Sequence, residues 1–311
     1  MRARFFCAVL AAAALLALPS IASAASAPPL VIGVGEQDAG IFSSKPWTQL
    51  AVRDVRYIVP WDALSSAWQR RETDAYMAAA ENAGARILLG FGHSRIESRR
   101  RVLPSPRQFR REFLRFRTRY PFVTNYLTWN EANHCSQPTC RRPDAVARFY
   151  DILKSSCAGC TVVGPAVLDK LDMPQWVRAV ERHAKHHIGI WAIHNYIDAN
   201  RFRTRGTKAL LRAVKGQIWF TETGGLVRRD NGSTIEFADS PTHAVRATKW
   251  VFKLARLSPR VRRVYFYHWV APEPDATWDS ALIDARGTPR PAYGVVQTYL
   301  RRSRAAQRAA G

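Results

Sequence analysis

The sequence predicts a single-domain (β/α)8 barrel. Eight short apolar runs rich in β-branched residues recur along the chain, and a loop and a stretch of helical periodicity follow most of them. Near-continuous apolar strands that alternate with helices indicate a parallel sheet covered on both faces. Eight such units in roughly 280 residues fit the usual size of about 250 residues for this barrel. An open doubly wound sheet is the alternative, but the first run leads into GVGEQDAG, which has an acid where a dinucleotide phosphate would lie.

The expected strands cover, in chain order, residues 30–35, 55–60, 86–92, 126–130, 161–167, 188–196, 217–222 and 261–269. Helix ends are recognisable between them. Ser65 or Ser66 can cap a helix that stops at Gly84, while Ser240 and Pro241 suit the start of another. We therefore expect helices over residues 66–83, 106–119, 144–156, 174–186, 207–215, 241–257 and 290–306, with a weak helix near WTQLAV.

The start of the chain predicts a secretory signal peptide over residues 1–24. A basic start precedes an apolar stretch from Phe5 to Leu18 and small residues up to Ala24. A retained membrane anchor is the alternative, but the stretch is shorter than the roughly 20 residues that span a bilayer. We therefore expect a secreted protein that has no membrane contact after cleavage, with one barrel domain over residues 28–305.

Four cysteines remain once the signal peptide, with Cys7, is removed. An even count in an exported protein favours two disulfides. CSQPTC and CAGC would each close a short local loop, which favours pairing Cys135 with Cys140 and Cys157 with Cys160. A zinc site built from the four thiolates is the alternative, but both pairs would have to converge, and an oxidising compartment argues against free thiolates. We expect no metal and no cofactor.

The net charge of +23 favours anionic partners, such as an acidic or wall-associated glycan. Only 8 of the 47 basic residues are lysine, and arginine is scattered through every segment, which indicates a compositional bias more than a focused patch. Basic tracts interleaved with aromatic residues, as a nucleic-acid groove requires, are missing from the sequence. The sequence therefore predicts no specific nucleic-acid partner, and we expect a monomer.

Polar residues stand where most of the expected strands end. In a (β/α)8 barrel the chemistry lies at these carboxyl ends, so the residues there are the candidate site. From the first strand to the eighth they are Glu36 and Asp38, Arg56 and Trp61, His93, Asn130 and Glu131, His194 and Tyr196, Glu222, and His268 and Trp269, with nothing comparable after the fifth strand.

Two of these residues, Glu131 and Glu222, carry the strongest functional signal. An ionised glutamate at the mouth of an apolar barrel is costly unless it is paired or has a task. The fourth and seventh strands face each other across the barrel, so the two carboxyls could flank one bond. That arrangement is typical of retaining glycoside cleavage, in which carboxyls about 5 to 5.5 Å apart act as nucleophile and as acid then base. Mutual repulsion would keep one of them protonated near neutral pH.

The same residues resemble clan A glycoside hydrolases, particularly the cellulase-like family 5 and the xylosidase-like family 39. The resemblance runs across the whole barrel and rests on Asn130 and Glu131, HNY at the sixth strand, Glu222 in TETGG, and Trp269. It implies Glu131 as acid/base and Glu222 as nucleophile. It further implies that Asn130 binds a sugar 2-hydroxyl, that Tyr196 positions the nucleophile, and that Trp269 forms the floor of the sugar site.

Substrate contacts are expected from a wider set of strand-end residues: Asn130, His93, His194, Tyr196, Trp269, Glu36 and Arg56. A strand-end glutamate can also be a helix cap or an ion-pair partner, and the histidines could hold a metal, although GVGEQ lacks the HxH pair usual in metal-dependent barrels. A secreted barrel that binds carbohydrate without catalysis is the second functional class. A binder, however, has no need of both Glu131 and Glu222.

Overall fold

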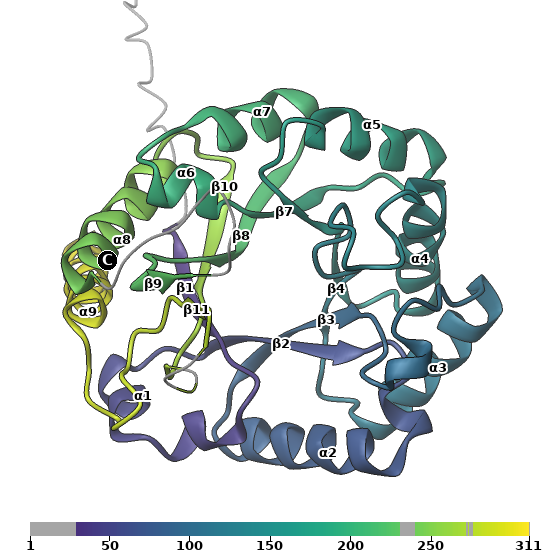
Figure 1. Ribbon diagram of the computed structural model, residues 1–311, viewed down its shortest axis with the longest axis horizontal. Helices are drawn as coiled ribbons and strands as arrows, with labels where there is room; N and C mark the ends of the chain where they lie inside the picture. The colour runs from purple at the N-terminus through teal and green to yellow at the C-terminus, as the bar shows by residue number, and fades with distance from the viewer. Residues whose placement is uncertain (1–28, 231–239, 272, 274–275, 311) are drawn as a thin grey trace, which may run out of the picture.

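The computed structural model describes residues 29–230, 240–271, 273 and 276–310. Its helices form a ring around an inner barrel of strands (Figure 1). The predicted signal peptide, residues 1–24, lies outside the described residues. Across the described ranges, no helix combines the length and the apolar character that crossing a membrane requires.

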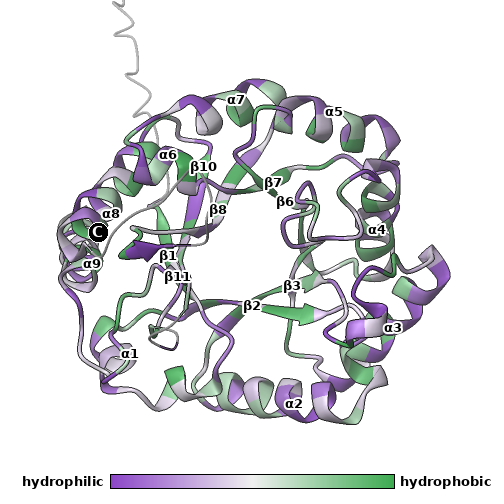
Figure 2. Cartoon of the chain, viewed as in Figure 1, coloured by the Kyte–Doolittle hydropathy of each residue, from purple (hydrophilic) through white to green (hydrophobic). Residues whose placement is uncertain are grey.

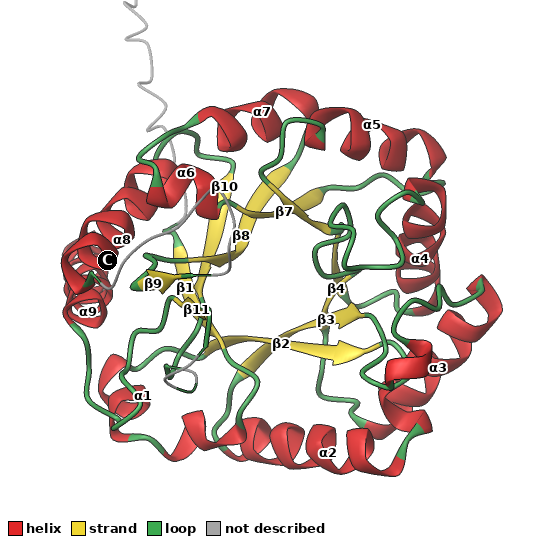
Figure 3. Ribbon diagram, viewed as in Figure 1, coloured by secondary structure: helices red, strands yellow, loops and turns green. Residues whose placement is uncertain are grey.

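The barrel sheet is parallel, and its strands follow one another around the ring in the order β5-β4-β3-β2-β1-β10-β8-β7-β6 (Figure 3). Each strand overlaps one of the eight predicted apolar runs, so the predicted fold is confirmed. The strands are β1 (Val31–Gly35), β2 (Asp54–Pro60), β3 (Arg86–Gly92), β4 (Asn125–Leu127), β5 (Thr161–Val163), β6 (Ala166–Leu168), β7 (Ile190–His194), β8 (Gln217–Thr223) and β10 (Val261–Phe266).

β5 and β6 are the two halves of the fifth strand. β5 pairs with β4, whereas β6 pairs with β7. Between the halves, the amide of Gly164 donates to the carbonyl of Ile190 at 2.8 Å, and the amide of Ala166 donates to the carbonyl of Trp129 at 2.9 Å. These bonds reach the neighbouring strand on each side, so the sheet closes into a barrel.

The helices cover the outside of the barrel, and most of their ends follow the sequence signals. Ser105 and Gln108 form a capping box at the start of α3, and Gly84, with a φ of 62°, follows the end of α2. The helices are η1 (Ala39–Ser43), α1 (Lys45–Leu50), η2 (Ala63–Ser65), α2 (Ala67–Asn82), η3 (Glu97–Arg99), α3 (Pro106–Arg119), α4 (Pro143–Ser156), α5 (Met173–His183), α6 (Tyr196–Asn200), α7 (Arg205–Ala213), α8 (Pro241–Ala255) and α9 (Pro291–Ala310). The sixth strand, β7, ends at His194, before the predicted end at residue 196, and the short α6 begins at Tyr196.

Apolar side chains fill the barrel and the layer between strands and helices. Figure 2 shows hydrophobic stretches along barrel strands such as β2 and β3. Trp219 and Tyr265 are the largest residues of the inner cluster, and both are almost fully buried. Gly33 makes room for one of them, because a Cβ at this position would lie 2.6 Å from the Tyr265 ring. The barrel is therefore a packed core, and a ligand site has to lie at one of its ends.

Both predicted disulfides are confirmed. Cys135 bonds to Cys140 in the loop that follows β4, and Cys157 bonds to Cys160 between α4 and β5. The first of these loops also carries His134, and an arginine from a neighbouring loop, Arg101, donates to the carbonyl of Cys135 at 2.6 Å. The disulfide thus ties down a segment that leads away from Glu131.

We expect Phe113→Ala to destabilise the protein by about 3 to 5 kcal/mol, because it removes a buried aromatic ring from the layer between α3 and the barrel. Phe113 is 0% exposed and lies edge-on to Phe91 and Tyr126. Urea unfolding followed by tryptophan fluorescence measures the change. Trp68→Ala is the control, because Trp68 is 40% exposed; an equal loss in both variants would contradict this assignment of the core.

Candidate active site

A cavity of about 490 Å³ lies at the carboxyl ends of the barrel strands. Its volume falls within the range of about 300 to 1,000 Å³ that small-molecule sites usually have. Glu131, which follows β4, and Glu222, on β8, both line the cavity, so the structure brings the two predicted acids together. The other lining residues are His134, Leu168, Asp169, Lys170, His194, Tyr196, Ile197, Arg229, Tyr267, His268 and Trp278.

Glu131 has a left-handed backbone conformation, with a φ of 47°. A residue other than glycine adopts this conformation at a cost, so its surroundings must hold it there. The amide of Asn130 donates to the carbonyl of Phe91 at 2.7 Å, and the amide of Ala132 donates to the carbonyl of Ala166 at 2.8 Å. Bonds to β3 on one side and to β6 on the other therefore fix the position of the Glu131 carboxyl.

The two carboxyls approach one another closely. One carboxylate oxygen of Glu131, one of Glu222 and a ring nitrogen of His194 all lie within 4.8 Å of one another. Retaining glycosidases hold their carboxyl pair at about 5 to 5.5 Å, whereas inverting enzymes leave about 6.5 to 9.5 Å for a water molecule. The separation in this chain suits direct attack by a carboxylate.

Arg56, on β2, supplies the fixed positive charge of the site. Its side chain is 1% exposed, and its Nη1 lies 2.8 Å from Oε2 of Glu222. Its Nη2 donates to Oδ1 of Asn130 and lies 3.4 Å from Nε2 of His194. Arg56 and Asn130 were expected to touch the substrate. The structure instead places them behind the cavity lining, where Arg56 orients the groups that face the cavity.

The contacts of His194 define its tautomer. Arginine can only donate, so the Arg56 group beside Nε2 requires Nε2 to accept. The proton of a neutral imidazole then lies on Nδ1, which is 3.1 Å from Oε1 of Glu131 and 3.7 Å from Oε2 of Glu222. His194 is completely buried and therefore links the arginine to the acid/base candidate by hydrogen bonds.

The pKa of Glu131 differs from the expectation that one acid would stay protonated near neutral pH. Burial raises the pKa of Glu131, but the hydrogen bond from His194 and the electrostatic interactions with His194, His134 and Arg56 outweigh burial and lower this pKa below 4.5. Repulsion between the two carboxyls does not dominate at Glu131, because a guanidinium and an imidazole lie beside them.

Tyr196 lines the cavity, but its hydroxyl does not bond a carboxylate. It donates to the backbone carbonyl of Tyr267 at 3.2 Å, in contrast to the expected bond to the nucleophile. Its ring meets that of Trp278 edge-on, with centroids 4.9 Å apart. Tyr196, Trp278 and Tyr267 therefore form the aromatic side of the cavity.

Besides Arg56 and Asn130, three of the expected contacts lie outside the cavity lining. Trp269 is 0% exposed and packs edge-on against Trp47 and Tyr293, which contradicts its expected place as the floor of the sugar site. Glu36 accepts from the backbone amides of Trp269 and Val270 at 3.1 and 3.2 Å and so joins β1 to the end of β10.

His93, the third, is held through its own loop. Its amide lies 3.3 Å from Oε1 of Gln137, and its Nδ1 lies 2.8 Å from the carbonyl of Ser94. These local bonds position the loop after β3, and the ring does not line the cavity that holds Glu131 and Glu222.

The sequence analysis missed several lining residues. Asp169 and Lys170 follow β6, which is the second half of the fifth strand, where no polar site residue is expected from the sequence. Burial is the main cause that raises the pKa of Asp169 to about 7. Arg229 and Trp278 meet because β9 (Arg228–Arg229) pairs with β11 (Trp278–Asp279), a contact between distant segments that no local pattern predicts.

Glu131, His194 and Glu222 offer ligand atoms that could reach a single metal ion. Arg56 argues against this use, because its guanidinium already binds Glu222 at 2.8 Å and contacts His194. A divalent cation would have to share both ligands with a fixed positive charge. The same three groups suit proton transfer and nucleophilic attack without that conflict.

The lowered pKa of Glu131 predicts a pH dependence of stability. Because its folded-state pKa lies below the value of 4.5 for a free glutamate, its ionisation stabilises the fold above pH 4.5. This contribution is lost as the pH falls through the folded-state pKa. The difference in unfolding free energy between the wild type and Glu131→Gln, measured with urea from neutral pH down to about pH 3, should therefore shift in favour of the variant as the pH falls. A constant difference would contradict the lowered pKa.

Comparisons with known proteins identify the fold. No family model and no curated protein matches the sequence. Among solved structures, a GH5_18 protein from Streptomyces cattleya in complex with GlcNAc matches with 17% identity and a TM-score of 0.64, over 90% of this chain and 81% of its own. A GH10 endoxylanase from a sugarcane soil metagenome matches with 14% identity and a TM-score of 0.61, over 87% of this chain and 96% of its own.

A β-xylosidase from Caulobacter crescentus CB15 matches with 16% identity and a TM-score of 0.62, over 87% of this chain and 67% of its own. At these identities the similarity shows the fold alone. The chain has the (β/α)8 barrel that these clan A glycoside hydrolase structures share.

Proposed function

We propose that this chain is a secreted retaining glycoside hydrolase that cleaves the O-glycosidic bonds, chiefly β-linked ones, of an oligo- or polysaccharide. The observation that carries the proposal is the approach of the Glu131 and Glu222 oxygens to within 4.8 Å in a cavity of about 490 Å³. Structures of similar fold include an endoxylanase, a β-1,4-mannanase and a β-xylosidase, which supports carbohydrate as the substrate. The pattern of residues 1–24 and the two disulfides support export.

Glu222 is the nucleophile in this proposal. A nucleophilic carboxylate must be negatively charged and aimed at the anomeric carbon. The Arg56 ion pair at 2.8 Å stabilises negative charge on Oε2 and fixes the orientation of the carboxylate. Attack by Glu222 forms the glycosyl-enzyme bond while the bond to the leaving oxygen breaks.

Glu131 donates a proton to that leaving oxygen and later removes one from the attacking water. The hydrogen bond from Nδ1 of His194 keeps the Glu131 carboxyl in one position during both steps. The lowered pKa suits the second step, in which Glu131 must be a base. In the first step, the protonated fraction of Glu131 is the reactive one.

The sugar itself is held by the aromatic side of the cavity and by the donors around it. Trp278 and Tyr196 present ring edges and faces of the kind that pack against sugar rings.

Two substitutions test the roles of the acids. Glu131→Gln should lower kcat by about 10² to 10⁴ on glycosides with poor leaving groups, because general acid catalysis contributes about that factor. The loss should be smaller on 2,4-dinitrophenyl glycosides, whose leaving group needs no proton. Glu222→Ala should abolish turnover on both kinds of substrate.

The products provide an independent measurement. NMR of the first sugar released should show the same anomeric configuration as the substrate, because two displacements restore it. Inverted product would contradict the retaining mechanism. The carbohydrate-binding barrel would be favoured by two results together: the wild type turns over no glycoside, and Glu131→Gln binds sugar as tightly as the wild type does.

The rate should also depend on pH through Glu131. The kcat/KM value reports the free protein, in which the pKa of Glu131 lies below 4.5. For a substrate with a poor leaving group, kcat/KM should therefore fall as the pH rises above this value, because the acid form becomes scarce. For a 2,4-dinitrophenyl glycoside the fall should disappear; the same profile for both substrates would contradict the acid role of Glu131.

A further inference from the structure

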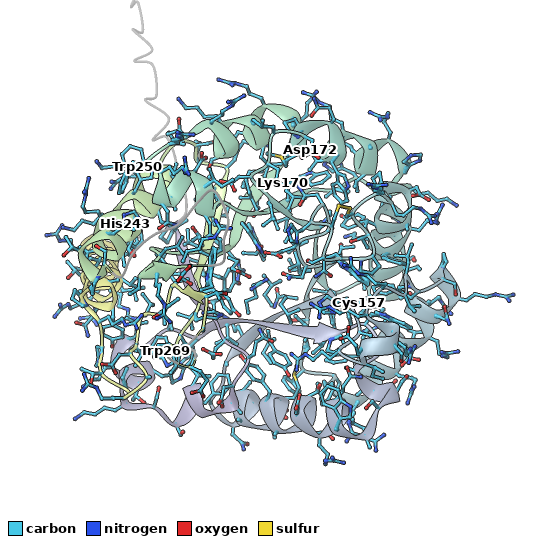
Figure 4. The ribbon with its side chains drawn as sticks, viewed as in Figure 1. Cys157, Lys170, Asp172, His243, Trp250 and Trp269 are labelled. Carbon is cyan, nitrogen blue, oxygen red and sulfur yellow. A yellow bond between two sulfur atoms is a disulfide. The ribbon has the colours of Figure 1, made fainter. Side chains whose placement is uncertain are left out.

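The cavity that holds the two acids adjoins a second hollow of the same volume, about 490 Å³. Asp169, Lys170 and Ile197 line both. Lys170 lies on the inner side of the ring of helices (Figure 4). Because the two spaces share this wall, one sugar chain can occupy both, with one unit beside Glu131 and Glu222 and further units beyond Lys170.

Four basic and two acidic side chains line the second hollow. Besides Lys170 it is lined by Arg201, Arg203 and Arg205. Among the residues that the structure describes, none of these three arginines forms an ion pair with a carboxylate. Lys170 has a distant partner in Asp172, at 3.8 Å, and both side chains are exposed to solvent.

The two carboxylates in the wall of this hollow are committed to the backbone. Oδ1 and Oδ2 of Asp198 accept from the amides of Gly206 and Thr207 at 3.1 and 2.6 Å. Oδ2 of Asp169 accepts from the amide of Asp198 at 2.9 Å. These bonds brace α6 and α7, and among the described residues neither carboxylate forms an ion pair with the arginines around it.

Arg229 extends the positive charge into the catalytic cavity. Its guanidinium lies 5.2 Å from the Trp278 ring, and its Nε is buried without a hydrogen-bond partner in the described part of the chain. Burial and the charge of the nearby Arg201 lower the pKa of Arg229. The positive charges of Arg229 and Arg201 repel each other, and a bound anion would relieve that repulsion.

We propose that this cleft binds an acidic glycan, with sugar carboxylates held by Arg229 and Arg201 next to the catalytic acids and by Lys170, Arg203 and Arg205 further along. This inference rests on the proposed function, because it assigns the substrate class of the same site. Guanidinium groups bind planar carboxylates through paired hydrogen bonds, so the arginines would select uronate units over neutral sugars.

The net charge of +23 would attract any polyanion weakly, so the test must separate this cleft from the rest of the surface. Arg229→Gln and Arg203→Gln each remove one charge from the cleft, and Arg203 is exposed, so its loss leaves the core intact. Arg110→Gln is the matched control, because it removes one exposed charge on α3, which α5 and α4 separate from α7 around the ring (Figure 1).

Binding is measured by calorimetry with two matched pairs of ligands. One pair is a β-1,4-linked glucuronate tetramer and cellotetraose, which differ in the group at C6; the other is an α-1,4-linked galacturonate tetramer and its methyl ester. In at least one pair the acidic member should bind about tenfold more tightly or better. Arg229→Gln and Arg203→Gln should reduce that preference, and Arg110→Gln should preserve it.

Equal affinity within both pairs, including no binding of any of the four, would overturn the inference. So would an equal effect of Arg110→Gln, or competition by a thymidine oligonucleotide at the affinity of the uronate tetramer. Hydrolysis is recorded separately: cleavage of a neutral glycoside without acidic preference would leave the proposed function standing and remove the inference. A preference for the acidic ligands in a protein that cleaves no glycoside would support the inference about binding and contradict the proposed hydrolase function.

Discussion

The buried guanidinium of Arg56 organises the mouth of the barrel. A fully buried arginine is tolerated only when its charge is paired and its N–H groups are hydrogen-bonded. Arg56 meets this need with Glu222, Asn130 and His194, which come from three different strand ends. One side chain of β2 thereby positions the nucleophile candidate Glu222 directly and the acid/base candidate Glu131 through the imidazole. The Nε atom of Arg56 remains without a partner among the described residues, so the pairing is incomplete.

This arrangement orients the two carboxyls but disfavours the protonated form of Glu131, which the first step of the proposed reaction needs. Arg56 and His194 both stabilise negative charge on their neighbours, and the lowered pKa of Glu131 is one result. In the first step the acid form is therefore scarce, while in the second step the base form is ready. In the proposed mechanism such a site favours the second step, in which Glu131 acts as a base, over the first.

The barrel and its two acids could be predicted from the sequence because both depend on local patterns. The apolar runs marked the strands, and Glu131 and Glu222 stood out as charges at strand ends. The same rule misplaced Trp269 and Glu36, since position at a strand end does not determine which way a side chain turns. Trp269 turned into the helix layer, where Trp47 and Tyr293 cover it, and Glu36 bonds the backbone there. The pair of Arg229 and Trp278 depends on contact between β9 and β11, which lies beyond any local pattern.

Because acidic residues are scarce in this chain, many arginines have no carboxylate partner, and the surroundings of each one determine how strongly it attracts an anion. The chain has 47 basic residues and 24 acidic ones, so carboxylates are the limiting partner. In the described residues several carboxylates each serve two arginines, as Asp54 does for Arg86 and Arg263. Elsewhere on the surface water and salt screen an unpaired arginine well. Arg229 differs, because it is half-buried, its Nε has no partner among the described residues, and the charge of Arg201 acts on it, so a negative charge from outside the chain has the most to stabilise there.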